Sequence, residues 1–185
     1  MIDAISEMFL TGVIDQKGKF VAGKTDRIRQ GDEGLEFVFY RDDKLNKDIV
    51  LTEVDIENIL RAKAAVYAGV TTLLGEVGFT LDTIEKVYIA GGFGNYINVE
   101  RAVILGMLPD MPKERFVFMG NTSITGAYLC LLSETLRKEA EGIASKMTYI
   151  ELSVSRNFMY EYMSALFLPH TDMGQFPTVE ALMKK

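Results

Sequence analysis

The sequence predicts an α/β fold in which helices flank a mixed sheet. Two strands that each precede a helix indicate a parallel β–α–β–α unit with a right-handed crossover, over residues 86–90 and 98–106, then 115–119 and 121–142. Shorter strands upstream, which are expected to pair locally, make the sheet mixed. The chain has 185 residues, of which 48% are hydrophobic and 25% charged, so it has the composition of a folded domain rather than a disordered one.

The first predicted element is a helix. Ile2, Ile5 and Phe9 follow helical spacing with no capping residue ahead of them, so we expect a fragment of a longer protein that begins inside a helix. Residues 13–20 are typical of a short strand and turn. Residues 23–34 are polar and rich in glycine, which predicts a mobile loop.

A hairpin and a long helix are predicted next. Strands are expected at residues 35–40 and 48–51, joined by a charged turn. Thr52 and Asp55 form a short-armed variant of the capping box, which predicts a helix from Glu53 to Glu76.

The remaining chain predicts the β–α–β–α unit and then a helical tail region. After the two strand–helix pairs, the region from Thr148 onwards predicts a short strand and a helix around Asn157 to Leu166. An extended tail that contains Pro169 and Pro177 is expected to follow.

Composition excludes several kinds of chemistry. The net charge of −6 is the wrong sign for a surface that binds nucleic acid. Cys130, the single cysteine and a predicted core residue, cannot form an internal disulfide, an iron–sulfur site or a structural zinc site. His170 is the single histidine and is expected at the surface. With one imidazole in the chain, a catalytic Ser–His or Cys–His pair is hard to form. We therefore predict no catalytic residue and no metal ligand in this chain.

The sequence also predicts a cytoplasmic protein. No run of about 18 uncharged apolar residues is present, so no membrane span is expected. The first ten residues carry acidic side chains and no basic leader, unlike a signal peptide.

The strongest local signal is a glycine-rich turn directly after a buried-type strand, formed by Gly91, Gly92, Phe93 and Gly94. Glycines allow a ligand to approach the backbone because they carry no Cβ, and open α/β sheets usually bind ligands at the carboxyl ends of their strands. Ile97 stands where a dinucleotide fingerprint needs its third glycine, and no Gly-Lys-Ser/Thr follows as in a P-loop. A tight strand-to-helix turn without a ligand explains the same residues.

Two further features could belong to the same site. Gly120 and Asn121 end the second strand and begin a helix, whose free N–H groups favour polar or anionic ligand groups; simple capping by Asn121 is the alternative. Lys63 falls on the inward stripe of the long helix, where a leucine would be expected. It must reach solvent, pair with a carboxylate or contact a ligand.

Several segments together resemble one protein family. The most distinctive are YIAGGFGNYI at residues 88–97, ILGMLP at 104–109 and GNT at 120–122. Further similar segments are residues 2–8, 51–56 with 62–64, and 149–152. In this order they resemble the carboxyl-terminal domain of the reductive activators of corrinoid proteins, over nearly the whole chain.

The resemblance implies a specific activity for the parent protein. Such activators carry an amino-terminal ferredoxin-like domain with a 2Fe–2S cluster, a linker and an ATPase domain of the actin, sugar kinase and chaperone ATPase superfamily. That domain has two ribonuclease-H-like lobes, which hold ATP with Mg²⁺ between them. ATP hydrolysis drives the electron transfer that returns a Co(II) corrinoid to Co(I).

On this resemblance, residues 1–185 are the carboxyl-terminal lobe of the ATPase domain, and the cluster domain and first lobe are absent. Gly91 and Gly92 would map to the adenosine-binding turn, and Lys63 to a helix near the adenine. The family's phosphate turn and the four cluster cysteines are missing from this sequence. The implied partners are a corrinoid protein, the chain's own amino-terminal domains and a second copy in a homodimer. Two alternatives stay open: a non-catalytic interaction or dimerisation module with the same fold, and a kinase-like phosphotransferase.

Overall fold

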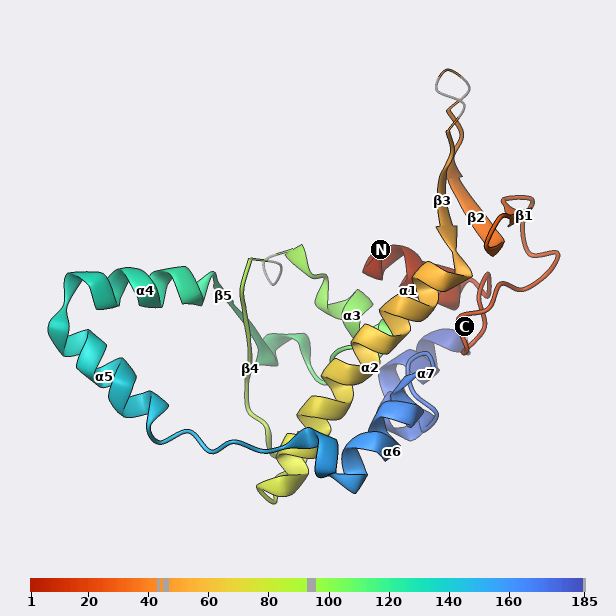
Figure 1. Ribbon diagram of the computed structural model, residues 1–185. Coiled ribbons are helices and arrows are strands. Elements are labelled where there is room, and N and C mark those ends of the chain that lie inside the picture. The colour runs from red at the N-terminus through yellow and green to blue at the C-terminus, as the bar shows by residue number, and fades with distance from the viewer. Residues whose placement is uncertain (43, 45–46, 93–95, 185) are drawn as a thin grey trace.

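The computed structural model describes residues 1–42, 44, 47–92 and 96–184. A helical body carries two projections, a β-hairpin sheet on one side and a pair of helices on the other (Figure 1). The helices and strands, in chain order, are α1 (Ile2–Leu10), β1 (Ile28–Gly31), β2 (Gly34–Tyr40), β3 (Ile49–Thr52), α2 (Glu53–Glu76), β4 (Val87–Ala90), α3 (Val99–Leu105), β5 (Phe116–Gly120), α4 (Thr122–Leu132), α5 (Glu134–Ala144), α6 (Arg156–Ala165) and α7 (Pro177–Met183).

The strands form two separate sheets, which corrects the single mixed sheet predicted above. β1, β2 and β3 make an antiparallel sheet, and β4 and β5 make a parallel one. The hairpin sheet precedes α2 and β4 follows it (Figure 1). A helix of 24 residues is about 36 Å long, so α2 holds the two groups of strands apart. β1 itself lies inside the segment 23–34, which the sequence predicted as a loop.

α2 has the predicted bounds because its start is fixed locally. Thr52 Oγ1 accepts a hydrogen bond from the Asp55 N–H at 3.1 Å, and Asp55 Oδ2 accepts one from the Thr52 N–H at 3.0 Å. This reciprocal capping box satisfies two backbone donors that the helix leaves free. The predicted cap is confirmed.

The parallel pair of β4 and β5 is confirmed, but the long helix predicted after β5 is two helices. Ser133 adopts an extended backbone with φ −141° and ψ 119°, and its side chain accepts a hydrogen bond from the Leu136 N–H at 3.3 Å. A serine that caps a new helix ends the previous one. Cys130 lies on α4, of which no residue is buried, so its predicted place in the core is wrong.

The carboxyl-terminal region confirms one prediction and corrects two. α6 lies where a helix was expected around residues 157–166. Residues 149–152 form no strand, although one was predicted from Thr148 onwards. The tail predicted as extended ends in α7, with Pro177 at its first position, where a missing N–H costs nothing.

The core joins segments from both ends of the chain. α1 packs against α3, and α2 packs against α6. Fully or almost fully buried side chains from five elements or loops meet there: Ile5, Ile56, Leu105, Phe176 and Val179. The body of the fold is therefore built on α2, and Leu168, Phe176 and Val179 pack the segment after α6 into it.

Candidate functional site

The two glycine turns lie side by side. Ala90 pairs with Gly120 in the parallel register, and the Gly91 N–H donates a hydrogen bond to the Gly120 carbonyl at 2.8 Å. β4 and β5 run in the same direction. Both turns therefore lie at the carboxyl end of the parallel sheet, as the β–α–β–α pattern predicts. Ligand binding there stays a prediction.

Space is free at the first turn. Gly91 has φ +101°, a conformation that residues with a Cβ rarely adopt. Apart from its chain neighbours, a Cβ added to Gly91 or Gly92 would meet no atom of the described residues within 4 Å. The space beside these two residues could therefore be filled by a ligand. Phe93 and Gly94, the other residues predicted in this turn, lie outside the described residues.

The second turn provides a helix amino-terminus. Asn121 is exposed and caps α4, since its Oδ1 accepts a hydrogen bond from the Ile124 N–H at 3.2 Å. The cap uses one of the free N–H groups in the first turn of α4. The other free N–H groups are directed toward the carboxyl end of β5. This arrangement suits a polar ligand group, and it also suits a cap with no ligand.

Lys63 contacts the carboxyl-terminal segment of the chain, and its predicted role at the ligand site stays a prediction. The residue is fully buried in the middle of α2. Its Nζ donates hydrogen bonds to the carbonyl oxygens of Phe167 at 2.5 Å and Pro169 at 2.7 Å. Burial lowers the pKa of its ammonium group from 10.5 to about 7. Both carbonyls belong to the segment after α6, which covers this face of α2.

Around Lys63 lies a group of buried and half-buried polar and aromatic side chains that we call the tail cluster: Lys63, Tyr67, Glu161, His170, Gln175 and Phe176. The Tyr67 hydroxyl donates a hydrogen bond to Gln175 Oε1 at 2.7 Å. Its ring centroid lies 5.5 Å from that of His170 and 5.4 Å from that of Phe176. These contacts fasten the carboxyl-terminal tail to α2.

His170 is buried, so its predicted place at the surface is wrong. Its Nδ1 accepts a hydrogen bond from the Asp172 N–H at 3.0 Å, which leaves the proton of the neutral ring on Nε2. Nε2 faces Glu161 Oε2 at 3.8 Å, and neither atom has a hydrogen-bond partner in the described part of the chain. Burial and the charge of Lys63 lower the pKa of His170, whereas burial and the charge of Asp172 raise the pKa of Glu161.

Sequence reasoning missed the tail cluster because its members are distant in sequence. Lys63 and Tyr67 stand four residues apart and share one helix face, a signal that is visible in the sequence. Their partners lie about one hundred residues further along the chain, and only the packing of the tail brings them together.

The described residues were also considered for a metal site and for a membrane-spanning helix. No group of three or more His, Cys, Asp or Glu side chains among them could hold a metal ion. None of the helices they form has the length and apolar character to cross a membrane.

Comparison with known proteins relates the chain to one group. Residues 1–180 match the family described as the C-terminal domain of RACo, the ASKHA domain. The chain is 34% identical over 177 residues to the corrinoid activation enzyme RamQ of Eubacterium limosum, covering 88% of this chain and 29% of RamQ. It is 32% identical over 124 residues to the [Co(II) methylated amine-specific corrinoid protein] reductase of Methanosarcina barkeri, covering 66% of this chain and 23% of that protein.

A solved structure is similar as well. The reductive activator for corrinoid,iron-sulfur protein is 48% identical and superimposes with a TM-score of 0.89 over 96% of this chain, which corresponds to 29% of the activator. The present chain thus spans less than a third of the length of each of these relatives.

Proposed function

Because this chain belongs to the family of the C-terminal ASKHA domain of RACo, we propose that it is the nucleotide-binding lobe of an ATP-dependent reductive activator of corrinoid proteins. The relatives named above support this proposal, since they are called corrinoid activation enzyme, corrinoid protein reductase and reductive activator. In the complete activator, ATP hydrolysis drives an electron from a 2Fe–2S cluster to the corrinoid and returns Co(II) to Co(I).

The observation that carries the nucleotide proposal is the hydrogen bond between Gly91 and Gly120. It holds two turns together at the carboxyl end of the parallel sheet, and no described residue other than their chain neighbours fills the space next to Gly91 and Gly92. Gly91, Gly92 and Gly120 would line the adenosine site, and Phe93 and Gly94, which we also propose for this site, lie outside the described residues. Asn121 would orient the amino-terminus of α4 toward a polar edge of the ligand.

The chain would bind nucleotide without hydrolysing it. Catalysis of phosphoryl transfer depends on positioning and on charge stabilisation by a phosphate-binding loop and Mg²⁺. The sequence contains no such loop and no four-cysteine cluster motif. We place the phosphate turn, the magnesium ligands and the 2Fe–2S domain in other parts of the complete activator, and the corrinoid protein and a second activator copy among its partners.

Substitution of Gly92 by valine tests the proposal in the complete activator. Gly92 is not among the glycines with positive φ, and no atom of the described residues beyond its chain neighbours lies within 4 Å of an added Cβ, so the fold should tolerate Gly92→Val. The new side chain should occupy the adenosine space and weaken ATP binding about thirtyfold, roughly 2 kcal/mol, in a calorimetric titration. Gly142→Val on α5 is the matched control, since its added Cβ also meets no atom within 4 Å.

The outcome of this test separates two candidate functions. If the Gly92→Val protein keeps its melting temperature and still binds ATP with normal affinity, the glycines form a turn but no nucleotide site. The interaction-module alternative would then be preferred. One observation favours that alternative already: α4 exposes large apolar side chains and buries none.

A further inference from the structure

We propose that the free edge of β4 and the apolar side chains next to it pair with β-strands from another part of the activator polypeptide, outside residues 1–185. The inference rests on the proposed function, since it takes this chain to be part of a longer activator. It adds where that further polypeptide attaches and in which form.

The parallel sheet is too small and too exposed to be complete. Parallel sheets are normally covered on both faces, and two strands alone are marginally stable. Tyr88 on β4 is 61% exposed and Phe118 on β5 is 44% exposed. The register pairs Tyr88 with Val117 and Ile89 with Phe118, so these two aromatic side chains lie on opposite faces. Both faces therefore have uncovered apolar surface.

One edge of this sheet is open. Within the described residues, β4 pairs only with β5. The other edge of β4 therefore presents backbone N–H and C=O groups without a ladder partner. Another β-strand satisfies such a row of groups, whereas a helix cannot, because the backbone groups of a helix already bond to each other. The edge thus specifies a strand as its partner.

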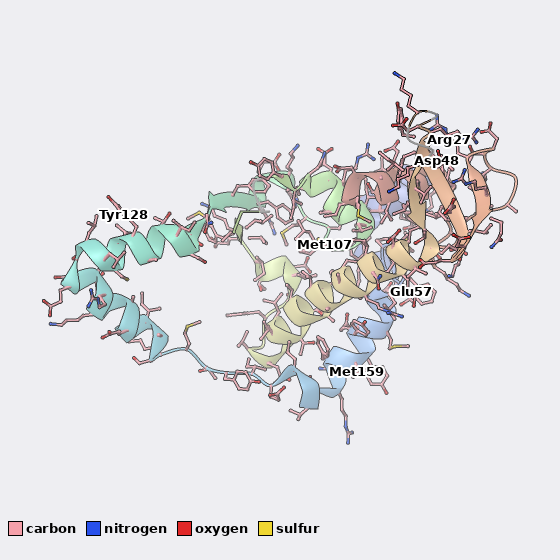
Figure 2. The ribbon with its side chains drawn as sticks, turned by 45° about the horizontal axis from the view of Figure 1, so that its top comes forward. Arg27, Asp48, Glu57, Met107, Tyr128 and Met159 are labelled. Atoms are coloured by element: carbon pink, nitrogen blue, oxygen red, sulfur yellow. The ribbon has the colours of Figure 1, made fainter. Side chains whose placement is uncertain are left out.

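α4 adds apolar surface next to β5. It extends with α5 away from the helical body (Figure 1), and Tyr128 lies on this arm, far from Met159 of α6 (Figure 2). No residue of α4 is buried. A helix that is apolar on most sides is normally buried. The exposed large side chains are Ile124, Tyr128, Leu129, Leu131 and Leu132.

The solved relative argues for the same polypeptide as the occupant. The reductive activator for corrinoid,iron-sulfur protein has this arrangement over 96% of the present chain, and the matched part is only 29% of its length. The same strands and arm therefore occur there within a chain more than three times as long, which has ample polypeptide to cover them. This argument favours further strands of one activator over a second copy.

A strand paired with the free edge of β4 would also help to fix the position of the glycine turn. Gly91 directly follows β4, and the described structure holds this strand on one side only. A strand on the free edge would fix both sides of β4 and with it the position of the turn. The proposed nucleotide site would then be better ordered in the complete activator than in residues 1–185 alone.

Photo-crosslinking in the complete activator tests the inference. Tyr88 is replaced by p-benzoylphenylalanine, which keeps an aromatic ring at an exposed position, and the crosslinked peptides are identified by mass spectrometry. We expect a crosslink within one polypeptide, to a segment outside residues 1–185. The matched control is the same replacement at Tyr160 on α6, which is 75% exposed and belongs to no sheet edge. It should give much less of this product.

Two results would overturn the inference. A crosslink between two activator copies, seen as a band of doubled mass, would assign the edge to a second copy. The absence of any product above the Tyr160 control would leave the edge uncovered. The measurement needs no nucleotide, so it can fail while the Gly92→Val test succeeds, and the reverse also holds.

Discussion

Gly106 lies directly against the carbonyl group of Pro169. A Cβ built on Gly106 would stand 2.0 Å from the Pro169 oxygen, and Gly106 ends α3 with φ +78°. The same oxygen accepts the hydrogen bond from Lys63 Nζ at 2.7 Å. One carbonyl of the tail therefore fits closely between α3 and α2.

The first prediction concerns this contact. Gly106→Ala should lower the free energy of unfolding by about 3 kcal/mol or more, from backbone strain and from the collision with a backbone oxygen. Gly23→Ala is the control, since Gly23 has φ +76° and open space around it. It should cost about 1 kcal/mol, the strain alone. Equal losses in chemical unfolding would contradict the contact with Pro169.

Lys63 predicts an unusual dependence of stability on pH. Its pKa is about 7 in the folded protein and 10.5 ordinarily, so above pH 7 the unfolded chain binds the extra proton. Stability should therefore rise with pH between 7 and about 9.5, by roughly 1 kcal/mol per pH unit. Tyr67, whose pKa is raised, titrates above this window, and His170, whose pKa is lowered from 6.5, titrates below it.

Urea unfolding at several pH values measures this slope. Lys63→Met removes the titrating group and should flatten the curve in the window. Lys138→Met on the exposed surface of α5 should leave the slope as it is. A wild-type curve that is already flat would show that the ammonium group is not buried as described.

The capping box gives a third prediction. Thr52→Ala removes the acceptor of the Asp55 N–H and should cost about 1 kcal/mol of stability. Thr52→Ser keeps the hydroxyl oxygen and should recover most of the loss. Thermal unfolding of both variants distinguishes a cap from a packing effect of the threonine methyl group, for which serine would not compensate.

The last prediction concerns iron. With Cys130 as its single cysteine, the purified chain should be colourless and hold no stoichiometric iron. Iron analysis and the visible spectrum measure this. One cluster per chain would refute the placement of the 2Fe–2S domain elsewhere in the activator.

Local signals predicted α2, the hairpin and the parallel pair because the deciding residues are close in sequence. Thr52 and Asp55 fix the start of α2, and the two glycine turns follow from the order of strands and helices. The break at Ser133 has a local cause too, but a capping serine inside a helical pattern is hard to distinguish from an ordinary helical one.

Long-range packing explains what the sequence could not predict. The separation of the two sheets depends on which strands meet in space. The burial of His170 and the partners of Lys63 depend on where the tail docks. Helical spacing indicated that Lys63 faces inward, yet it could not distinguish a ligand from two backbone carbonyls of a distant segment.

The meeting of Ile5 and Val179 in one core has a consequence for synthesis on the ribosome. Ile5 is translated early, whereas Phe176 and Val179 of the same buried cluster follow about 170 residues later, so this core stays incomplete until α7 has been made. Contacts this distant in sequence also slow folding. We therefore expect the nascent chain to expose apolar surface while these residues are translated and to depend on chaperones until α7 emerges.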